Sequence, residues 1–240
     1  ICVAGHEVIE GSDEQETKVS QRHVRPVIEQ GQISWTYLQA FQLGSIVDLG
    51  KVQARASYPE VEDVVFLLQQ CRQFGRVTSA EFWSVLCSTV RTSLHEIFGH
   101  VLVPHYGTYY VMQGQGHCSL GELRLHPSQI HLFVETEQYG NRLRLSVSTE
   151  RGLLRLPVTD VRFYRPPAWD VVEEAVQEME RMLHSATDEV ILGVGLTRPF
   201  APTGFHAPVH WLQVNNIHVS ADPLWQGSLR THQPIGIDLE

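Results

Sequence analysis

The sequence predicts a mainly β fold with helices, of the α+β class, and three observations predict it. Side chains alternate between apolar and polar from Tyr109 to Tyr164, with turn residues between short segments. A single clear helix over 79–98 divides the chain, and a second helix over 167–184 precedes the last strands. Short strands at such spacing are typical of small barrels or sandwiches. We therefore expect two β-rich units on either side of a helix.

The first unit begins with two strand candidates, 1–9 and 19–28, separated by the acidic loop EGSDEQETK. A third candidate covers 45–57 and ends before Pro59. The segment EDVVFLLQQCRQF over 62–74 is ambiguous, because a short apolar run fits either a strand or a helix. We expect strands to dominate this unit.

The helix predicted over 79–98 has a start signal, an apolar stripe and a stop signal. Thr78 or Ser79 supplies the N-cap with Glu81 close behind, and Gly99 is a natural end. The stripe consists of Phe82, Leu86, Val90, Leu94 and Ile97. We expect one continuous helix that buries this stripe.

The second unit combines three strands, HLFVETE, RLRLSVST and LLRLPVTDVRFY, with the helix over 167–184. That helix places apolar and acidic residues on opposite faces. Its apolar face is Val172, Val176, Met179 and Leu183, and its acidic face is Glu173, Glu174, Glu178 and Glu180. Strands over 189–196 and 209–219 complete the unit.

The composition bounds the functional classes. The net charge of −9 argues mildly against a general nucleic-acid binder, since such proteins are usually basic. The four cysteines are widely spaced and form no C-x-x-C pair, which favours reduced thiols and a cytoplasmic location. No apolar run approaches the roughly 20 residues of a membrane helix. We expect no membrane association and no secretory signal.

The segment HEIFGH over 95–100 is close to the H-E-x-x-H signature of zinc proteases, but its two histidines are five residues apart. On a continuous helix that spacing turns them about 500° and leaves them out of line for one metal ion. No other histidine pair has a strong ligand spacing, and neither a nucleophile elbow nor a phosphate-binding loop occurs. We expect no enzyme activity, no metal and no cofactor. A hydrolase that uses an unrecognised histidine site is the weakest alternative.

An arginine-bearing sheet face is the main binding candidate. Alternation places Phe133, Arg144 and Arg155 on the outward side of neighbouring strands, a surface that suits base stacking and phosphate contacts. A turn at Tyr139-Gly140 would instead pair Glu137 with Arg142 and Glu135 with Arg144. On that alternative the face is neutralised by its own ion pairs.

Three further arginines extend the set. Arg162 and Arg155 have no obvious partner, which favours binding. Arg22 and Arg25 lie in or beside the strand 19–28 and point to opposite faces, so they form no single patch, and ordinary surface charge is an equal alternative.

Seven short segments, in order, resemble the Dual OB-containing domain family of prokaryotic proteins. They are ICVAGH, HVRPV, YPEVEDV, FGRVTSAEFW, LRLPVTDVRF, VILGVGLTRPF and HWLQVNNIHV, and they span nearly the whole chain. The resemblance implies two consecutive OB-like β-barrels and nucleic-acid binding in mobile-element or phage-defence systems. Two departures occur: His23 stands where the family usually has an aromatic residue, and the PE motif leads into a long apolar run.

We therefore expect three parts: a first OB-like barrel over 1–78, a helix and linker over 79–106, and a second OB-like barrel over 107–240 with the helix 167–184 inserted. The expected role is non-catalytic binding of single-stranded or structured DNA or RNA within a larger protein complex. Phe133 would stack, and phosphates would meet Arg144, Arg155 and Arg162, with Arg22 and Arg25 serving the first barrel. The alternative is a protein-interaction adapter that uses the acidic helix and the barrel edges.

Overall fold

The computed structural model describes residues 3–10, 17–29, 33, 41–137, 140–149 and 152–231. Strands dominate, and the predicted α+β class with a β majority is confirmed. Three α-helices occur in the described ranges: α1 (Ser79–Thr89), α2 (Leu94–Phe98) and α3 (Glu173–Ser185). Short 3-10 turns lie at Leu68–Gln70, Gly99–Val101, Pro127–Gln129, Val161–Phe163 and Gly227–Thr231.

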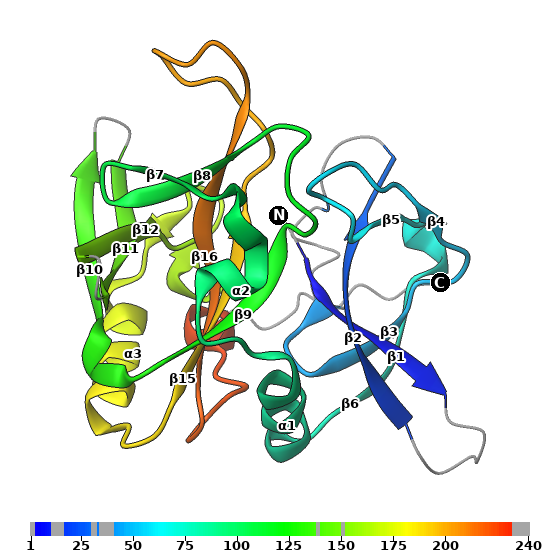
Figure 1. Cartoon of the computed structure of the whole chain (residues 1–240). Helices are drawn as coiled ribbons and strands as arrows, with labels where there is room; N and C mark the ends of the chain where they lie inside the picture. The colour runs from blue at the N-terminus through cyan, green and yellow to red at the C-terminus, as the bar shows by residue number, and fades with distance from the viewer. Residues whose placement is uncertain are drawn as a thin grey trace.

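Strands β1 to β6 form the first lobe, which lies on the right of Figure 1. A four-stranded sheet has the order β1-β2-β5-β4, and β3 pairs with β6 separately. The bounds are β1 (Gly5–Glu10), β2 (Thr17–Val27), β3 (Ser45–Asp48), β4 (Gln53–Ala54), β5 (Asp63–Val65) and β6 (Arg72–Arg76). The ambiguous segment 62–74 thus holds strand β5, a 3-10 turn and the start of β6.

Strands β7 to β16 form the second lobe, on the left of Figure 1. A five-stranded sheet has the order β7-β8-β16-β15-β9, and a three-stranded sheet has the order β10-β11-β12. The bounds are β7 (Val103–His105), β8 (Thr108–Met112), β9 (Leu120–Leu125), β10 (Ile130–Glu137), β11 (Gly140–Thr149), β12 (Gly152–Pro157), β13 (Tyr164–Arg165), β14 (Asp170–Val171), β15 (Val190–Leu196) and β16 (Val209–Val219).

The expectation of one helix over 79–98 is wrong, because the chain breaks between α1 and α2. Thr78 caps α1 as predicted, in a reciprocal pair of hydrogen bonds with Glu81. After α1, Arg91 leaves the helical path and bonds to β9: its N–H donates to the Glu122 carbonyl at 2.9 Å, and its carbonyl accepts from Arg124 at 2.8 Å. Ser93 then caps α2. Backbone bonding to the sheet outweighs continuation of the helix.

The main core lies in the second lobe. Its buried cluster runs from Ile97 to Trp225 and includes both sheets and α3. The predicted apolar face of α3 is confirmed, since Val176, Met179 and Leu183 are buried against β10 and neighbouring turns. Burial of this stripe, worth about 1.5–3 kcal/mol for each large apolar side chain, stabilises the helix against the sheet.

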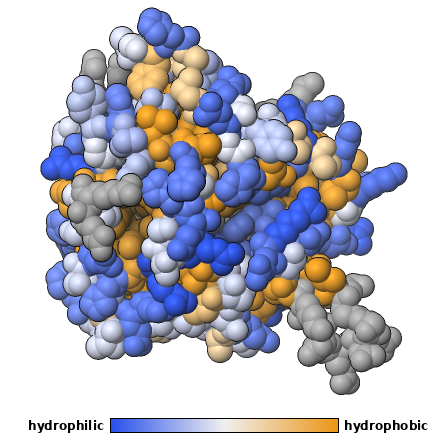
Figure 2. Space-filling view, in the orientation of Figure 1, coloured by the Kyte–Doolittle hydropathy of each residue, from blue (hydrophilic) through white to orange (hydrophobic). Residues whose placement is uncertain are grey.

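Figure 2 shows one face of the molecule, on which apolar residues form scattered patches among hydrophilic ones. Within the described ranges, no helix combines the length and the apolar character that a membrane span requires.

Candidate functional site

The strand register of the predicted arginine face differs from expectation. Glu137 pairs with Gly140, Glu135 with Arg142, and Phe133 with Arg144. The predicted pairs of Glu137 with Arg142 and Glu135 with Arg144 are therefore shifted by two residues. Tyr139 of the predicted turn, and residue 138 before it, lie outside the described residues.

Arg144 is nevertheless neutralised by the same two glutamates. Its Nε atom donates to Glu135 at 2.9 Å, and its Nη2 atom donates to Glu137. Both contacts run diagonally across the strand pair, which long side chains can reach. Arg144 therefore offers a phosphate little free charge, as the ion-pair alternative predicted for this residue.

The other members of the predicted face differ in exposure. Phe133 is only half-buried, and its ring stacks on His131 with centroids 6.3 Å apart. Arg155 is exposed, and its guanidinium has no partner among the described residues. Its backbone N–H donates to the Gly107 carbonyl, next to the almost fully exposed Tyr106. Of this face, Arg142 and Arg155 remain exposed cations without a partner among the described residues.

Arg162 has a structural place, contrary to the expectation that it lacks a partner. Only 1% of the residue is exposed. Its guanidinium forms a bidentate pair with the buried Asp160 and also donates to the carbonyls of Trp225 and Ile217. The group additionally lies over the Trp225 ring at 5.1 Å. Arg162 is therefore withdrawn from the proposed nucleic-acid contacts.

Arg22 and Arg25 point to opposite faces of β2, as predicted. Arg22 is exposed and lies 3.6 Å from Glu7. Arg25 is buried, with its Nε atom 2.5 Å from Asp63. Arg25 is thus not available at the surface for a phosphate, and it too is withdrawn from the contact set.

An ion network joins the two lobes. Arg198, in the loop after β15, donates to Glu60 at 2.9 Å and to Asp63 at 2.7 Å. Asp63 binds Arg25 with its other oxygen. Nearby, Glu62 accepts hydrogen bonds from Ser119 and the Leu120 N–H at the start of β9. These acidic residues are buried, so the pairing offsets the desolvation of their charges.

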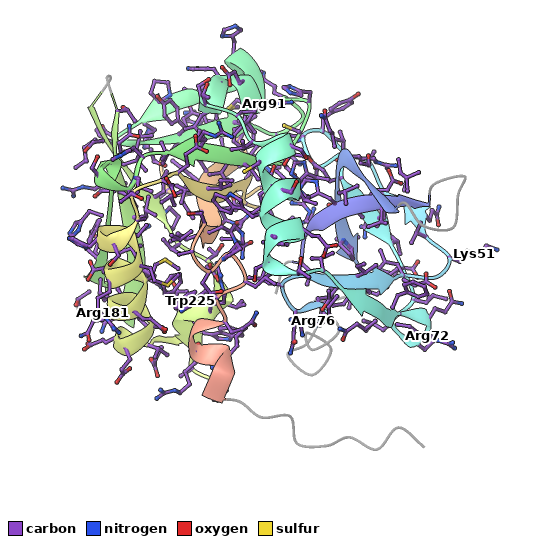
Figure 3. All side chains as sticks on the ribbon, turned by 90° about the horizontal axis from the view of Figure 1, so that it is seen from below. Lys51, Arg72, Arg76, Arg91, Arg181 and Trp225 are labelled. Atoms are coloured by element: carbon purple, nitrogen blue, oxygen red, sulfur yellow. The ribbon has the colours of Figure 1, made fainter. Side chains whose placement is uncertain are left out.

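A basic and aromatic surface that the sequence reasoning missed lies on β6. Gly75 pairs with Ile46 and Gln73 pairs with Val47, which leaves Phe74 as the extra residue of a β-bulge. Phe74 is 83% exposed. Arg72, Arg76 and Lys51 are also exposed, and Figure 3 shows these three on the first lobe, across the molecule from Arg181 of α3. The alternating Arg-x-Phe-x-Arg pattern of the segment RQFGR was the available signal.

The charges of this surface are largely free. Neither Arg72 nor Lys51 forms a side-chain ion pair with another described residue. Arg76 donates to the Gln42 side chain and the Leu43 carbonyl, both neutral acceptors, and no carboxylate among the described residues pairs with it. In the strand register, the acidic residue Asp48 lies opposite Arg72. We name the surface of Lys51, Arg72, Phe74 and Arg76 the β6 surface.

A second arrangement that the sequence reasoning missed is a histidine–glutamate cluster between the lobes. His6 and His23 face each other in the register of β1 and β2, and Glu122 approaches from β9. The two Nε2 atoms lie 3.1 and 2.8 Å from the same Glu122 oxygen. Burial alone would raise the pKa of Glu122, but the hydrogen bonds of His23 and His6 outweigh it and hold that pKa well below its usual value.

The motif HEIFGH does not form such a cluster. Gly99 ends α2 as predicted, with φ of 75°, and the turn brings the His95 and His100 rings to 5.7 Å. The divergence that a continuous helix would impose does not occur, because the helix ends at Gly99. Among described residues, the three-ligand group is His6, His23 and Glu122. The nearby Cys118 thiol is a poor nucleophile, because burial raises its pKa to about 12.

Comparisons with known proteins found no matching family model, no similar curated protein and no similar solved structure.

Proposed function

We propose that the protein binds single-stranded nucleic acid at the β6 surface. Phe74 would stack on a base, and Lys51, Arg72 and Arg76 would contact phosphates on either side. The observation that carries the proposal is the 83% exposure of Phe74 at a bulge of β6, in a strand that also carries the exposed Arg72 and Arg76. An aromatic ring of this exposure has no role in the core and is the kind of group that interfaces use.

The chemistry favours a single strand over a duplex. Unpaired bases present their faces for stacking, which is worth about 1–3 kcal/mol per base and tolerates any sequence. The arginines and the lysine add a salt-dependent attraction to the phosphates. The net charge of −9 opposes binding only in part, because the first lobe's Glu60 and Asp63 are buried and paired with arginines.

The OB-like interpretation fits this proposal. We infer that the two lobes are the predicted OB-like units before and after the connecting helices. OB-like units bind oligonucleotides on a sheet face. The resemblance to the Dual OB-containing domain family supports the same role, within a defence or mobile-element complex that includes protein partners. Arg155 with Tyr106 would form a second, weaker contact on the other lobe.

The test is fluorescence anisotropy with labelled single-stranded DNA, single-stranded RNA and duplex over a series of salt concentrations. We expect saturable binding to single strands that weakens log-linearly with salt. Arg72→Ala should lower the magnitude of the salt slope by about 0.7, the value for one phosphate of a single strand. Arg181→Ala removes another exposed arginine, on α3, and should leave the slope unchanged.

Two outcomes would redirect the proposal. If Arg155→Ala lowers the slope and Arg72→Ala does not, the interface lies on the second lobe. If no oligonucleotide binds even at low salt, the protein is better explained as an adapter, for which the exposed Glu173 and Glu174 of α3 are available.

A further inference from the structure

The histidine–glutamate cluster has a geometry that strand pairing imposes. Residues directly opposite in an antiparallel pair project their side chains to the same face. His6 and His23 are such a pair, and their ring centroids lie 4.5 Å apart. Glu122 reaches them from β9, which the start of β1 approaches in Figure 1. Backbone pairing of β1 with β2 therefore fixes the two histidines side by side, and the side chain of Glu122 joins them from a different sheet.

The separations suit a small divalent ion. The three ligand atoms, one from each side chain, all lie within 4.8 Å of one another. The two nitrogen-to-oxygen distances are 3.1 and 2.8 Å. Ligands at about 2.0–2.2 Å from a tetrahedral Zn²⁺ lie about 3.3 Å apart. If each nitrogen-to-oxygen distance increased by a few tenths of an ångström, the three ligand atoms would therefore leave room for the ion between them.

The cluster leaves one buried carboxylate oxygen without a described partner. Glu122 is only 7% exposed, and its Oε2 atom is buried with no hydrogen-bond partner among the described residues. Both histidines bond to the other oxygen. With neutral imidazoles the group carries one buried negative charge, and a divalent ion would offset that charge and use the free oxygen. His6 Nδ1 is also buried without a described hydrogen-bond partner. It would lack one with or without a bound metal ion, so it favours neither state.

We propose that His6, His23 and Glu122 form a binding site for a divalent transition-metal ion that ties β1 and β2 to β9. The donor set of two imidazoles and one carboxylate fits Zn²⁺ best, and it leaves a fourth position for water. The histidine side chains are 11% and 18% exposed, so the cluster is not fully closed to solvent. The site stabilises the joint between the lobes and is separate from the β6 surface.

The test uses the full chain after dialysis against a chelator. Zn²⁺ titration in competition with a chromogenic chelator should show one site, and Zn²⁺ should raise the melting temperature. Co²⁺ should give the visible absorption bands of a tetrahedral centre. The near-isosteric Glu122→Gln should weaken Zn²⁺ binding more than about 10-fold, since loss of even an outer-shell partner costs that much. His23→Asn should do the same.

Control variants distinguish this site from other histidines that could bind the ion. His206→Ala removes an exposed histidine far along the chain and should leave binding unchanged, as should His100→Ala in HEIFGH. Circular dichroism of each variant checks folding, and the Co²⁺ spectrum of the unaltered protein needs no variant. A wild-type protein with neither Zn²⁺ binding nor Co²⁺ bands would overturn the proposal. So would Zn²⁺ binding that His100→Ala abolishes and Glu122→Gln leaves intact.

Discussion

Arg198 of the second lobe donates a hydrogen bond to Asp63 of the first, with 2.7 Å between Nη1 and Oδ2. Asp63 holds Arg25 with its other oxygen, so one buried carboxylate compensates two guanidinium groups. The residues come from segments that are far apart in the sequence, and the network therefore depends on the lobes being in place. Its integrity can be measured through stability.

Replacement of the shared carboxylate of Asp63 should lower the free energy of unfolding strongly. Asp63→Asn removes the charge opposite Arg25, which is 2% exposed and would remain buried without compensation. Removing one partner of a buried ion pair costs about 3–5 kcal/mol. Arg198→Ala should cost less, because its side chain is 53% exposed and its charge is partly screened by solvent. Urea unfolding of both variants checks the order, and equal losses would contradict it.

Arg162 and Arg155, for which the sequence predicts the same phosphate-binding role, should behave in opposite ways. Arg162→Ala leaves Asp160 buried without its partner and removes donors to two carbonyls. We expect a loss of about 3–5 kcal/mol in the free energy of unfolding. Arg155→Ala, at an exposed position, should change stability by less than about 0.5 kcal/mol. Denaturant melts of the pair provide the measurement, and a stable Arg162→Ala protein would refute the structural role.

Stability should fall between pH 6.5 and 4 because of His218. Burial lowers the pKa of His218 to about 4, and the positive charge of Arg162 adds to the effect. In the unfolded chain His218 binds a proton near the ordinary histidine pKa of about 6.5. In the folded protein it binds a proton only near pH 4. Stability is therefore full above that window and lost as the pH falls through it, by up to about 3 kcal/mol.

A variant isolates this contribution from other acid effects. His218→Leu cannot be protonated, so its stability should decline less than that of the wild type between pH 7 and 4.5. Urea unfolding at both pH values gives the difference. The prediction fails if the two proteins lose the same stability over this range.

Phe74→Ala should weaken binding of single strands without affecting folding. The ring is 83% exposed, so its loss removes little packing. Loss of one stacked base corresponds to about 1–3 kcal/mol, or about 5- to 150-fold in the dissociation constant. The salt slope should stay constant, because no charge is removed. Phe200→Ala, which truncates a 49% exposed ring in the loop between β15 and β16, is the matched control.

Local patterns determined the elements of this chain. Alternation predicted the strands of the second lobe, with Leu143, Leu145 and Val147 buried and Arg142 and Ser148 exposed. The 3.6-residue period predicted the buried face of α3, and the Thr78–Glu81 capping box predicted the start of α1. These features follow from interactions between residues close in sequence, which a pattern can report.

Tertiary structure determined which charged residues are buried and which partners they have. The Arg91 backbone bonds to β9 and ends a helix that its own sequence would continue. Arg25 and Arg162 resemble surface cations in sequence, but carboxylates placed by the fold make their burial possible. Glu122 meets His6 and His23 across 116 and 99 residues, and no local spacing encodes that meeting. Strand pairing and desolvation act between distant segments, so they become visible only once the sheets are assembled.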